Sequence, residues 1–451
     1  MENNELNFDT LVATDAPDLS SIVSNEDKLS TLSQLGVFTS DAYMSSLPEE
    51  KSAEEVALDN AEAHKPTVQI DLNVDTENII LSRTELIRAL RYAGVMIKKV
   101  TNDIEASSLN ITYSDDGKVL YRLKDNMTYV TVEGTCKVSG EKPLIKTLSF
   151  NTTYLTKLLS AAAEDFLIFM DKATDAKGEE KDVIKARLIN GDMILDVFEG
   201  NEAKLNAPGT KSEKINSVAG NVINTLCDVM IPLIADTQEV SSKRTIIYED
   251  RAFFRSVTYL LQFRNEFSKM CLTKKELDLL KIVASKVGTG NVDFYRVDSN
   301  GENRIMIVAP NVSISTSISV PNRDELIVGR FAELENAKYM KIDKNDFKRV
   351  LFLSGLGTNN VARVTMNYNI DGAGVDAKII GRDGNSSFLI SGNNYNNLEP
   401  RSEAVTIYAV QLSVLLKSFE TGKDLEIAFL NSGVAFRDQT LGIEAIMNYS
   451  N

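Results

Sequence analysis

The feature that most constrains the fold is a pattern that recurs along residues 79–418. Each copy has a short apolar-x-apolar strand, a capping residue and an amphipathic helix. A pattern repeated at a near-constant period predicts an architecture of similar, stacked units. Six segments carry it: IILSRTELIRAL from Ile79, TLSFNTTYLTKLL from Thr147, EKINSVAGNVINTL from Glu213, MCLTKKELDLLKIV from Met270, YMKIDKNDFKRVLF from Tyr339 and VTIYAVQLSVLLKS from Val405.

Five of the six copies share the spacing of a hydrophobic staple, in which an apolar residue before the cap contacts one four positions after it. The third copy fits badly, because its best cap, Asn216, is followed by Gly220 where the second staple residue should stand. Four of the caps, Ser82, Asn151, Thr273 and Asp343, are favourable, whereas Tyr408 is a poor one. The staple pairs are Leu81/Leu86, Phe150/Leu155, Leu272/Leu277, Ile342/Phe347 and Ile407/Leu412.

Each predicted helix is followed by alternating, β-branched-rich runs that are separated by turn signals such as Asn190-Gly191 and Asp383-Gly384. One unit is therefore about one helix and four strands, with a period of roughly 65 residues. A single helix cannot cover a four-stranded sheet, so we expect the units to pair. The predicted fold class is α+β, with three tandem domains of two βαβββ half-units each.

The charge of the chain is unevenly distributed. Residues 1–66 hold 14 acidic and three basic residues, which is −11 of the net charge of −15, and the remaining 385 residues hold only −4. This segment is also poor in aromatic residues, so it buries too little apolar surface to offset the entropy cost of ordering. We expect a disordered acidic N-terminal tail over 1–66 and a nearly neutral body, which can still present a basic face.

The same composition argues against several classes of protein. One histidine, His64, cannot build a multi-histidine metal site, and no phosphate-binding Gly-x-x-x-x-Gly-Lys-Ser/Thr loop occurs. Three cysteines that are far apart in the sequence do not indicate a disulfide framework, and no apolar run is long enough to span a membrane. No pair of carboxylates stands out for acid–base chemistry. We expect no cofactor, no metal and no enzyme activity, although a site built from Asp and Glu would leave little trace.

The body resembles the bacterial beta type of DNA sliding clamp over residues 67–451. The last unit, EAVTIYAVQLSVLLKSFETGKDLEIAFLNSGVAFRDQ with EAIMNY near the C-terminus, follows the closing order of that family. The run VPNRDELIVGRFAELENAKYMKIDKNDFKRVL, with its Gly329-Arg330-Phe331 step, is similar to the family's link between the second and third domains. The resemblance implies clamp domains at 67–204, 205–335 and 336–451. The acidic tail and the third unit depart from the family, and a divergent phage or viral member would fit.

The resemblance further implies that two chains close a ring around double-stranded DNA, with helices lining the hole and sheets outside. The first, second and last helices suit that role, because their basic residues fall opposite their apolar stripes at 100° per residue, whereas the faces of the fourth helix are less cleanly divided. Scattered Lys and Arg side chains attract phosphates without reading sequence. The third helix lacks them. The predicted DNA-facing residues are Arg88, Arg91, Lys98, Lys99, Lys157, Lys274, Lys275, Lys348, Arg349 and Lys417.

Sliding clamps bind DNA polymerase and clamp loader through short peptides of the pattern Gln-x-x-apolar-Phe. By resemblance, the pocket for the apolar end comprises Val257, Tyr259, Leu272, Thr273, Leu277, Ala445 and Met447, and methionine suits such an adaptable surface. These residues could equally be ordinary core. The tail contains the same pattern, at Gln34, Leu35, Val37 and Phe38, which suggests self-docking as an alternative to a chance match.

Two rival functions share the predicted fold. One is a clamp-like scaffold that serves transcription or regulation without encircling DNA. The other is a β-rich viral structural protein. We expect a homodimeric, non-membrane protein of the cytoplasm, which would be the host cytoplasm for a viral protein.

Overall fold

The computed structural model describes most of the chain from Asn78 onward. The whole acidic tail lies outside the described residues. The described ranges are 78–97, 108–114, 116–140, 147–161, 164–174, 177–189, 194–236, 244–247, 251–256, 258–264, 269–299, 302–319, 329–356, 363–369, 374–381, 384–393, 404–419 and 425–448.

The first half of the described chain forms three of the predicted units. Unit 1 comprises β1 (Asn78–Leu81), α4 (Arg83–Met96), β2 (Ser108–Tyr113), β3 (Lys118–Lys124) and β4 (Thr128–Ser139). Unit 2 comprises β5 (Thr147–Asn151), α5 (Thr152–Ala161), β6 (Phe166–Thr174), β7 (Glu180–Leu188), β8 (Ile194–Asp196) and β9 (Phe198–Glu199). The short α6 (Glu202–Leu205) follows, and unit 3 then comprises β10 (Thr210–Ala219), α7 (Gly220–Asp236), β11 (Arg244–Ile247), β12 (Arg251–Arg255) and β13 (Tyr259–Arg264).

The second half repeats the same order. Unit 4 comprises β14 (Met270–Thr273), α8 (Lys274–Val287), β15 (Asn291–Ser299), β16 (Glu302–Ala309) and β17 (Val312–Ser317). The 3-10 turn η3 (Ala332–Leu334) precedes unit 5, which comprises β18 (Met340–Ile342), α10 (Lys344–Leu356), β19 (Arg363–Asn369), β20 (Gly374–Gly381) and β21 (Gly384–Asn393). Unit 6 comprises β22 (Val405–Tyr408), α11 (Ala409–Lys417), β23 (Leu425–Phe429), β24 (Gly433–Asp438) and β25 (Ile443–Asn448).

The predicted α+β class is confirmed, and all five staple pairs are buried in one core cluster. The third copy follows the same spacing, but its helix begins later in the sequence than expected. Helix α7 begins at Gly220, three residues later than a cap at Asn216 would require. The staple pair is then Val218 and Ile223, which have the same five-residue separation as the other pairs and are 8% and 0% exposed.

Gly220 explains why α7 needs no polar cap. Its N–H donates to the carbonyl of Gly290 at 2.9 Å, and the Asn221 N–H donates to the carbonyl of Gly288 at 2.7 Å. The backbone after α8 therefore satisfies two donors that a capping side chain would otherwise serve. A Cβ at Gly220 would lie 2.7 Å from the Gly288 oxygen and 2.8 Å from the Ala284 oxygen, so this approach requires glycine.

The units are joined in pairs by exchange of their first strands. Strand β1 of unit 1 pairs with β6 of unit 2, while β5 of unit 2 pairs with β2 of unit 1. The same exchange joins units 3 and 4 through β10–β15 and β14–β11, and units 5 and 6 through β18–β23 and β22–β19. All of these ladders are antiparallel. The residue boundaries predicted for the three domains stay a prediction.

The pairs are then linked by their last strands. Residues Val312–Thr316 of β17 pair with Thr128–Val132 of β4, and Tyr259–Phe263 of β13 pair with Ile443–Met447 of β25. Each sheet therefore continues across a junction, with 13 strands in one and 12 in the other. Two strands have one edge without such a partner among the described residues: β8, at the end of one sheet path, and residues 384–391 of β21 in the other.

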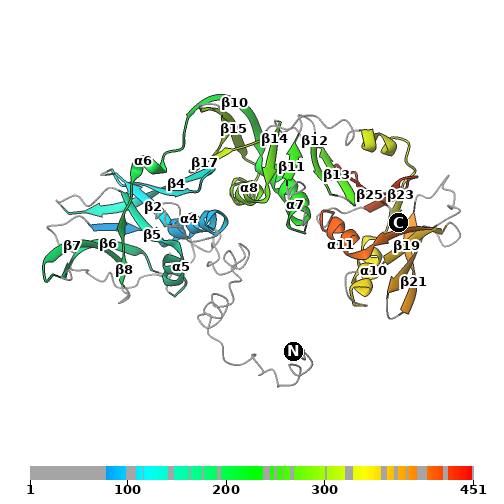
Figure 1. Ribbon diagram of the computed structural model, residues 1–451, viewed down its shortest axis with the longest axis horizontal. Coiled ribbons are helices and arrows are strands. Elements are labelled where there is room, and N and C mark those ends of the chain that lie inside the picture. Colours follow the sequence, from blue (N-terminus) through cyan, green and yellow to red (C-terminus); the bar gives the residue numbers. More distant parts are fainter. Residues whose placement is uncertain are drawn as a thin grey trace, which may run out of the picture.

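The helices α4, α5, α7, α8, α10 and α11 form a row on the concave side of an arc, and the sheets lie on the convex side (Figure 1). Contacts between neighbouring helices set the order α5–α4–α8–α7–α11–α10. The concave side thus presents one helix from every unit, as predicted. At each junction a helix pair accompanies the strand pair, with α4 against α8 beside β4–β17 and α7 against α11 beside β13–β25.

Candidate nucleic-acid interface

Three of the predicted basic residues project from the helix row into solvent. Lys157 of α5 and Arg349 of α10 are exposed and occupy the same place in the repeat, six residues after the cap. Lys417, the last residue of α11, is also exposed. The apolar faces of these helices pack into the core, through Leu155, Phe347 and Leu412 for example, so their exposed residues lie on the concave side.

The other predicted basic residues of α4 and α10 have mixed positions. Arg88 and Arg91 on α4 are half-buried, and Lys348 on α10 is exposed. All three interact with other groups of the protein. Lys98 and Lys99 lie outside the described residues.

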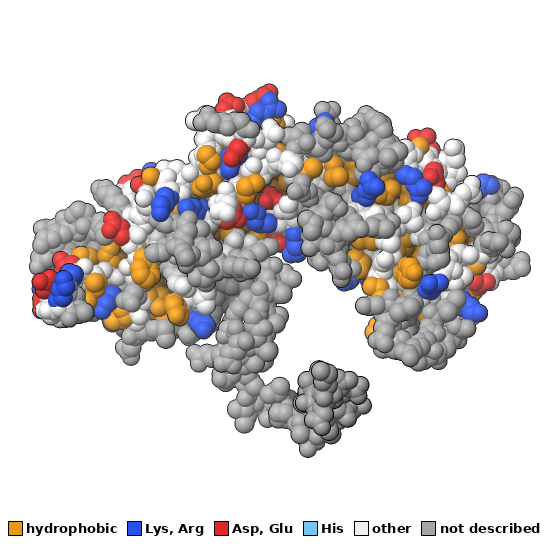
Figure 2. All heavy atoms as spheres, viewed as in Figure 1, with side chains coloured by type: hydrophobic (Ala, Val, Ile, Leu, Met, Phe, Trp, Pro, Cys, Tyr) orange, Lys and Arg blue, Asp and Glu red, His pale blue; other side chains and the backbone are white. Residues whose placement is uncertain are grey.

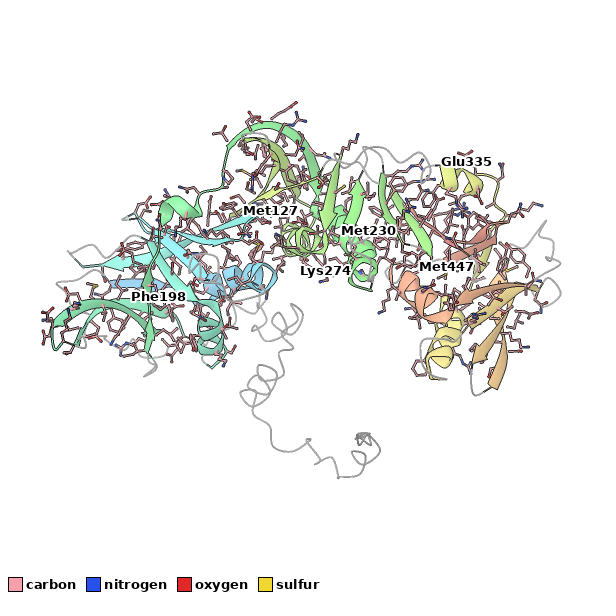
Figure 3. All side chains as sticks on the ribbon, viewed as in Figure 1. Met127, Phe198, Met230, Lys274, Glu335 and Met447 are labelled. Carbon is pink, nitrogen blue, oxygen red and sulfur yellow. The ribbon has the colours of Figure 1, made fainter. Side chains whose placement is uncertain are left out.

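The lysines of α8 are held by carboxylates. Lys274, labelled at the concave edge in Figure 3, lies 2.8 Å from an Asp278 oxygen. Lys275 reaches across to unit 1, where its Nζ is 2.9 Å from Asp125, and Lys281 is 2.9 Å from Asp228 on α7. The side chains of Lys274 and Lys275 are only 26% and 18% exposed. The two α8 lysines that the sequence placed against DNA are thus neutralised within the protein.

The predicted peptide pocket maps to the junction between units 3 and 6. Tyr259 of β13 stands opposite Met447 of β25 in the antiparallel register. Leu272 and Leu277 belong to β14 and α8 of the neighbouring unit, and together with Ala445 these five apolar residues are at most 4% exposed. The structure gathers them in one core cluster rather than around an open surface.

Thr273 has a structural role at the start of α8. It forms a capping box, in which its hydroxyl and backbone N–H interact with the Glu276 carboxylate. This contact satisfies the first turn of the helix. Val257 and the tail residues Gln34, Leu35, Val37 and Phe38 lie outside the described residues.

Large hydrophobic side chains are exposed mainly at the two ends of the arc. One end, defined here as end face A, carries Tyr154 of α5, Ile194 of β8 and Phe198 of β9, which are 61%, 46% and 49% exposed. The other, end face B, carries Phe352 of α10 and Leu389 of β21, which are 68% and 46% exposed. Hydrophobic and basic side chains both reach the surface at these ends (Figure 2), and Figure 3 labels Phe198 on end face A.

The sequence contained a signal for end face B. Phe352 lies five residues after the buried Phe347, which places it roughly 140° around the helix from the core side. An exposed aromatic residue indicates contact with another surface only when further apolar residues are exposed with it, as Leu389 is on this end face.

The described residues show no candidate metal cluster and no membrane-spanning helix. They contain no group of three or more His, Cys, Asp and Glu residues that could hold a metal ion. The thiol of Cys227 is fully buried and donates to the Leu277 carbonyl, and burial raises its pKa, so it is a poor nucleophile. No helix in this part of the chain is long and apolar enough to cross a membrane.

The arrangement matches solved structures of bacterial clamps over their full length. The beta sliding clamp of Caulobacter crescentus has a TM-score of 0.66 and 11% sequence identity, covering 84% of this chain and 100% of that one. The sliding clamp of Bartonella birtlesii, DNA polymerase III subunit beta, solved with griselimycin bound, gives 0.65 and 13%, covering 83% and 100%. The DNA polymerase III beta subunit of Thermotoga maritima gives 0.61 and 11%, covering 83% and 100%.

No family model and no curated protein matches the sequence. The match to solved structures establishes that this chain has the sliding-clamp fold, which was the fold expected from the resemblance.

Proposed function

We propose that this protein is a sliding clamp, in which two copies close a ring around duplex DNA and tether DNA polymerase as a processivity factor. The observation that carries the proposal is the match between the free ends of the arc and its internal junctions. Each internal junction joins two last strands and two helices. End face A offers the open edge of β8, which is paired with β7 on its other side, together with α5, and end face B offers the open edge of β21 with α10.

A second copy completes this pattern. β8 of one chain would pair with β21 of the other, and α5 would contact α10, as α4 contacts α8 within the chain. The exposed hydrophobic residues of both end faces would then be buried, which supplies the driving force for association. Two different patches that meet head to tail generate a ring when the rotation closes. Six helices from each chain would line the hole.

The ring explains how weak contacts can hold DNA for long periods. Exposed cations on the helix row attract phosphates without sequence preference, and their attraction falls as salt rises. Retention then depends on the closed protein ring around the duplex and not on tight binding, so sliding stays free.

Cutting the DNA circle tests this function. The protein would be loaded on a nicked circular duplex, and unbound protein would be removed. The bound protein should then stay on the circle at moderate salt. After a single restriction cut, most of it should leave, because a ring slides off ends. Gel filtration of the DNA before and after cutting measures both states. A clamp-like scaffold that does not encircle DNA predicts equal retention on circle and linear DNA, which would exclude the ring.

We also propose that the surface beside β13 and β25 binds the apolar end of partner peptides, including those of DNA polymerase and clamp loader. Tyr259 and Met447 are adjacent there. Among the similar structures, one clamp binds griselimycin and another carries polyethylene glycol at a region named for tethering a beta motif. Since the predicted residues are buried, binding requires Tyr259 or Met447 to turn aside, a change available to the flexible methionine.

The tail motif should compete for this surface. Deleting residues 1–66 should raise the affinity for a labelled Gln-x-x-apolar-Phe peptide by roughly tenfold, because a tethered competitor acts at high effective concentration. Fluorescence anisotropy measures the affinity. Phe38→Ala in the full chain should reproduce the gain, whereas Phe8→Ala, in the same tail but outside the motif, should not. Equal affinities for all four proteins would disprove self-docking.

The phage or viral origin and the cytoplasmic location stay predictions from the sequence.

A further inference from the structure

The three helix pairs differ in charge. Helices α4 and α5 together contain four basic residues and one acidic residue, and α10 with α11 contain the same numbers. The central pair, α7 and α8, contains four basic and four acidic residues. All four basic residues of this pair lie on α8. The concave row is therefore positive at both ends and neutral in the middle.

Within the central pair, individual lysines are also neutralised by carboxylates close to them. Lys281 of α8 is paired with Asp228 of α7, and Lys274 is paired with Asp278 one turn further along α8. Lys275 is held by Asp125 of unit 1, and Lys286 has a partner within the protein. A lysine that is already neutralised by a carboxylate contributes little to DNA binding, because a phosphate would have to displace that carboxylate and would then face its negative charge.

Three cations of the end pairs are available. Lys157, Arg349 and Lys417 are exposed and form no ion pair with any residue in the described part of the chain. Helices α5 and α11 contain no acidic residue, and the one acidic residue of α10, Asp346, accepts a bond from the Ser391 N–H.

We infer that phosphates are bound by the helices on either side of the subunit junction and not by α7 and α8. This inference rests on the proposed ring. Around the hole the order would be α11, α10, then α5 and α4 of the second copy, so each subunit junction forms one continuous positive sector. Two positive sectors would alternate with two neutral ones, and the duplex would lie against a junction and leave the central helices free of phosphate contacts.

The salt dependence of duplex binding tests this arrangement. Anisotropy of a labelled duplex of about 30 base pairs would be titrated with the full chain at several KCl concentrations, and log Kd plotted against log salt. Lys157→Ala should lower the magnitude of the slope by about 0.9 for each phosphate that the side chain neutralises. Arg349→Ala and Lys417→Ala should behave in the same way. Lys281→Ala is the matched control, since it removes the same charge from the same helix row, and it should leave the slope unchanged.

A gain of binding provides the converse test. Asp228→Asn should free Lys281 and raise the slope by about 0.9. Adding Lys281→Ala should return the slope to that of the original protein, which shows that the gain belongs to the freed lysine. If Lys281→Ala lowers the slope as much as Lys157→Ala, the neutral sector is disproved while the ring survives. If the unchanged protein shows no salt-dependent binding of duplex, this inference fails, whereas the ring itself is tested by the cut-circle experiment.

Discussion

Replacing Phe352 and Leu389 together with glutamate should convert the proposed dimer to a monomer of 49.8 kDa. Both side chains are exposed on end face B, so the substitutions remove no core packing from the single chain. In the ring each carboxylate would be placed against the hydrophobic side chains of end face A, where an unpaired charge costs several kcal/mol. The dimer should weaken by roughly 1,000-fold or more. Light scattering coupled to gel filtration measures the mass.

Met127→Glu is the control for this double variant. Met127 is 52% exposed but lies in the turn between β3 and β4, away from both end faces. It should remain dimeric, and both variants should keep the circular dichroism spectrum of the original protein. The monomer should also leave circular DNA before any cut. A double variant that stays dimeric would show that the chains associate through another surface.

Replacing Arg304 with alanine should lower the free energy of unfolding by about 3 kcal/mol. Its side chain is 2% exposed where units 1 and 4 meet, and it donates to the Met127 carbonyl at 3.0 Å. It also binds Glu302 at 3.2 Å and lies over the Tyr129 ring at 5.6 Å. Truncation removes these interactions and leaves a cavity between β16 and β4. Urea unfolding followed by circular dichroism measures the change.

Arg296→Ala is the matched control for the junction. Arg296 is on β15, next to β16, where it lies opposite Ile305, and its side chain is exposed. Its truncation should therefore change the free energy of unfolding by no more than about 0.5 kcal/mol. An Arg304→Ala variant as stable as Arg296→Ala would mean that the β4–β17 ladder holds the junction without the arginine. The buried hydroxyl pair of Thr128 and Thr316, 2.9 Å apart, and the Lys275–Asp125 ion pair would then be the side-chain contacts to test next.

Much of the fold could be predicted because its rules are local. A strand that feeds a helix needs two apolar residues five apart around the cap, and six such pairs occur. The third is not found by a local rule, because Asn216 has the side chain of a good cap three residues before the true start of α7. The carbonyls of Gly288 and Gly290 accept the hydrogen bonds that a capping side chain would otherwise accept. These residues are about 70 positions away in the sequence, so a local rule cannot find them.

The candidate interface was less predictable because charge depends on neighbours. A helical wheel separates Lys275 from the core side of α8, but its partner Asp125 is 150 residues earlier and reaches it only through the β4–β17 junction. The same holds for Lys281 and Asp228, which meet because α7 packs on α8. Lys157 and Arg349 could be identified because their helices place few acidic residues near them.

Because paired units exchange their first strands, the sheets of a pair can be completed only after both units have been synthesised. When unit 1 has left the ribosome, β2 still lacks its neighbour β5 and β1 lacks β6, so two strand edges stay open until both strands of unit 2 have emerged. The nascent chain therefore gains stability in steps of two units, and a chain that stops after an odd number presents edges suited to pairing with another polypeptide. Only chains that end after unit 2, 4 or 6 have all their exchanged strands paired.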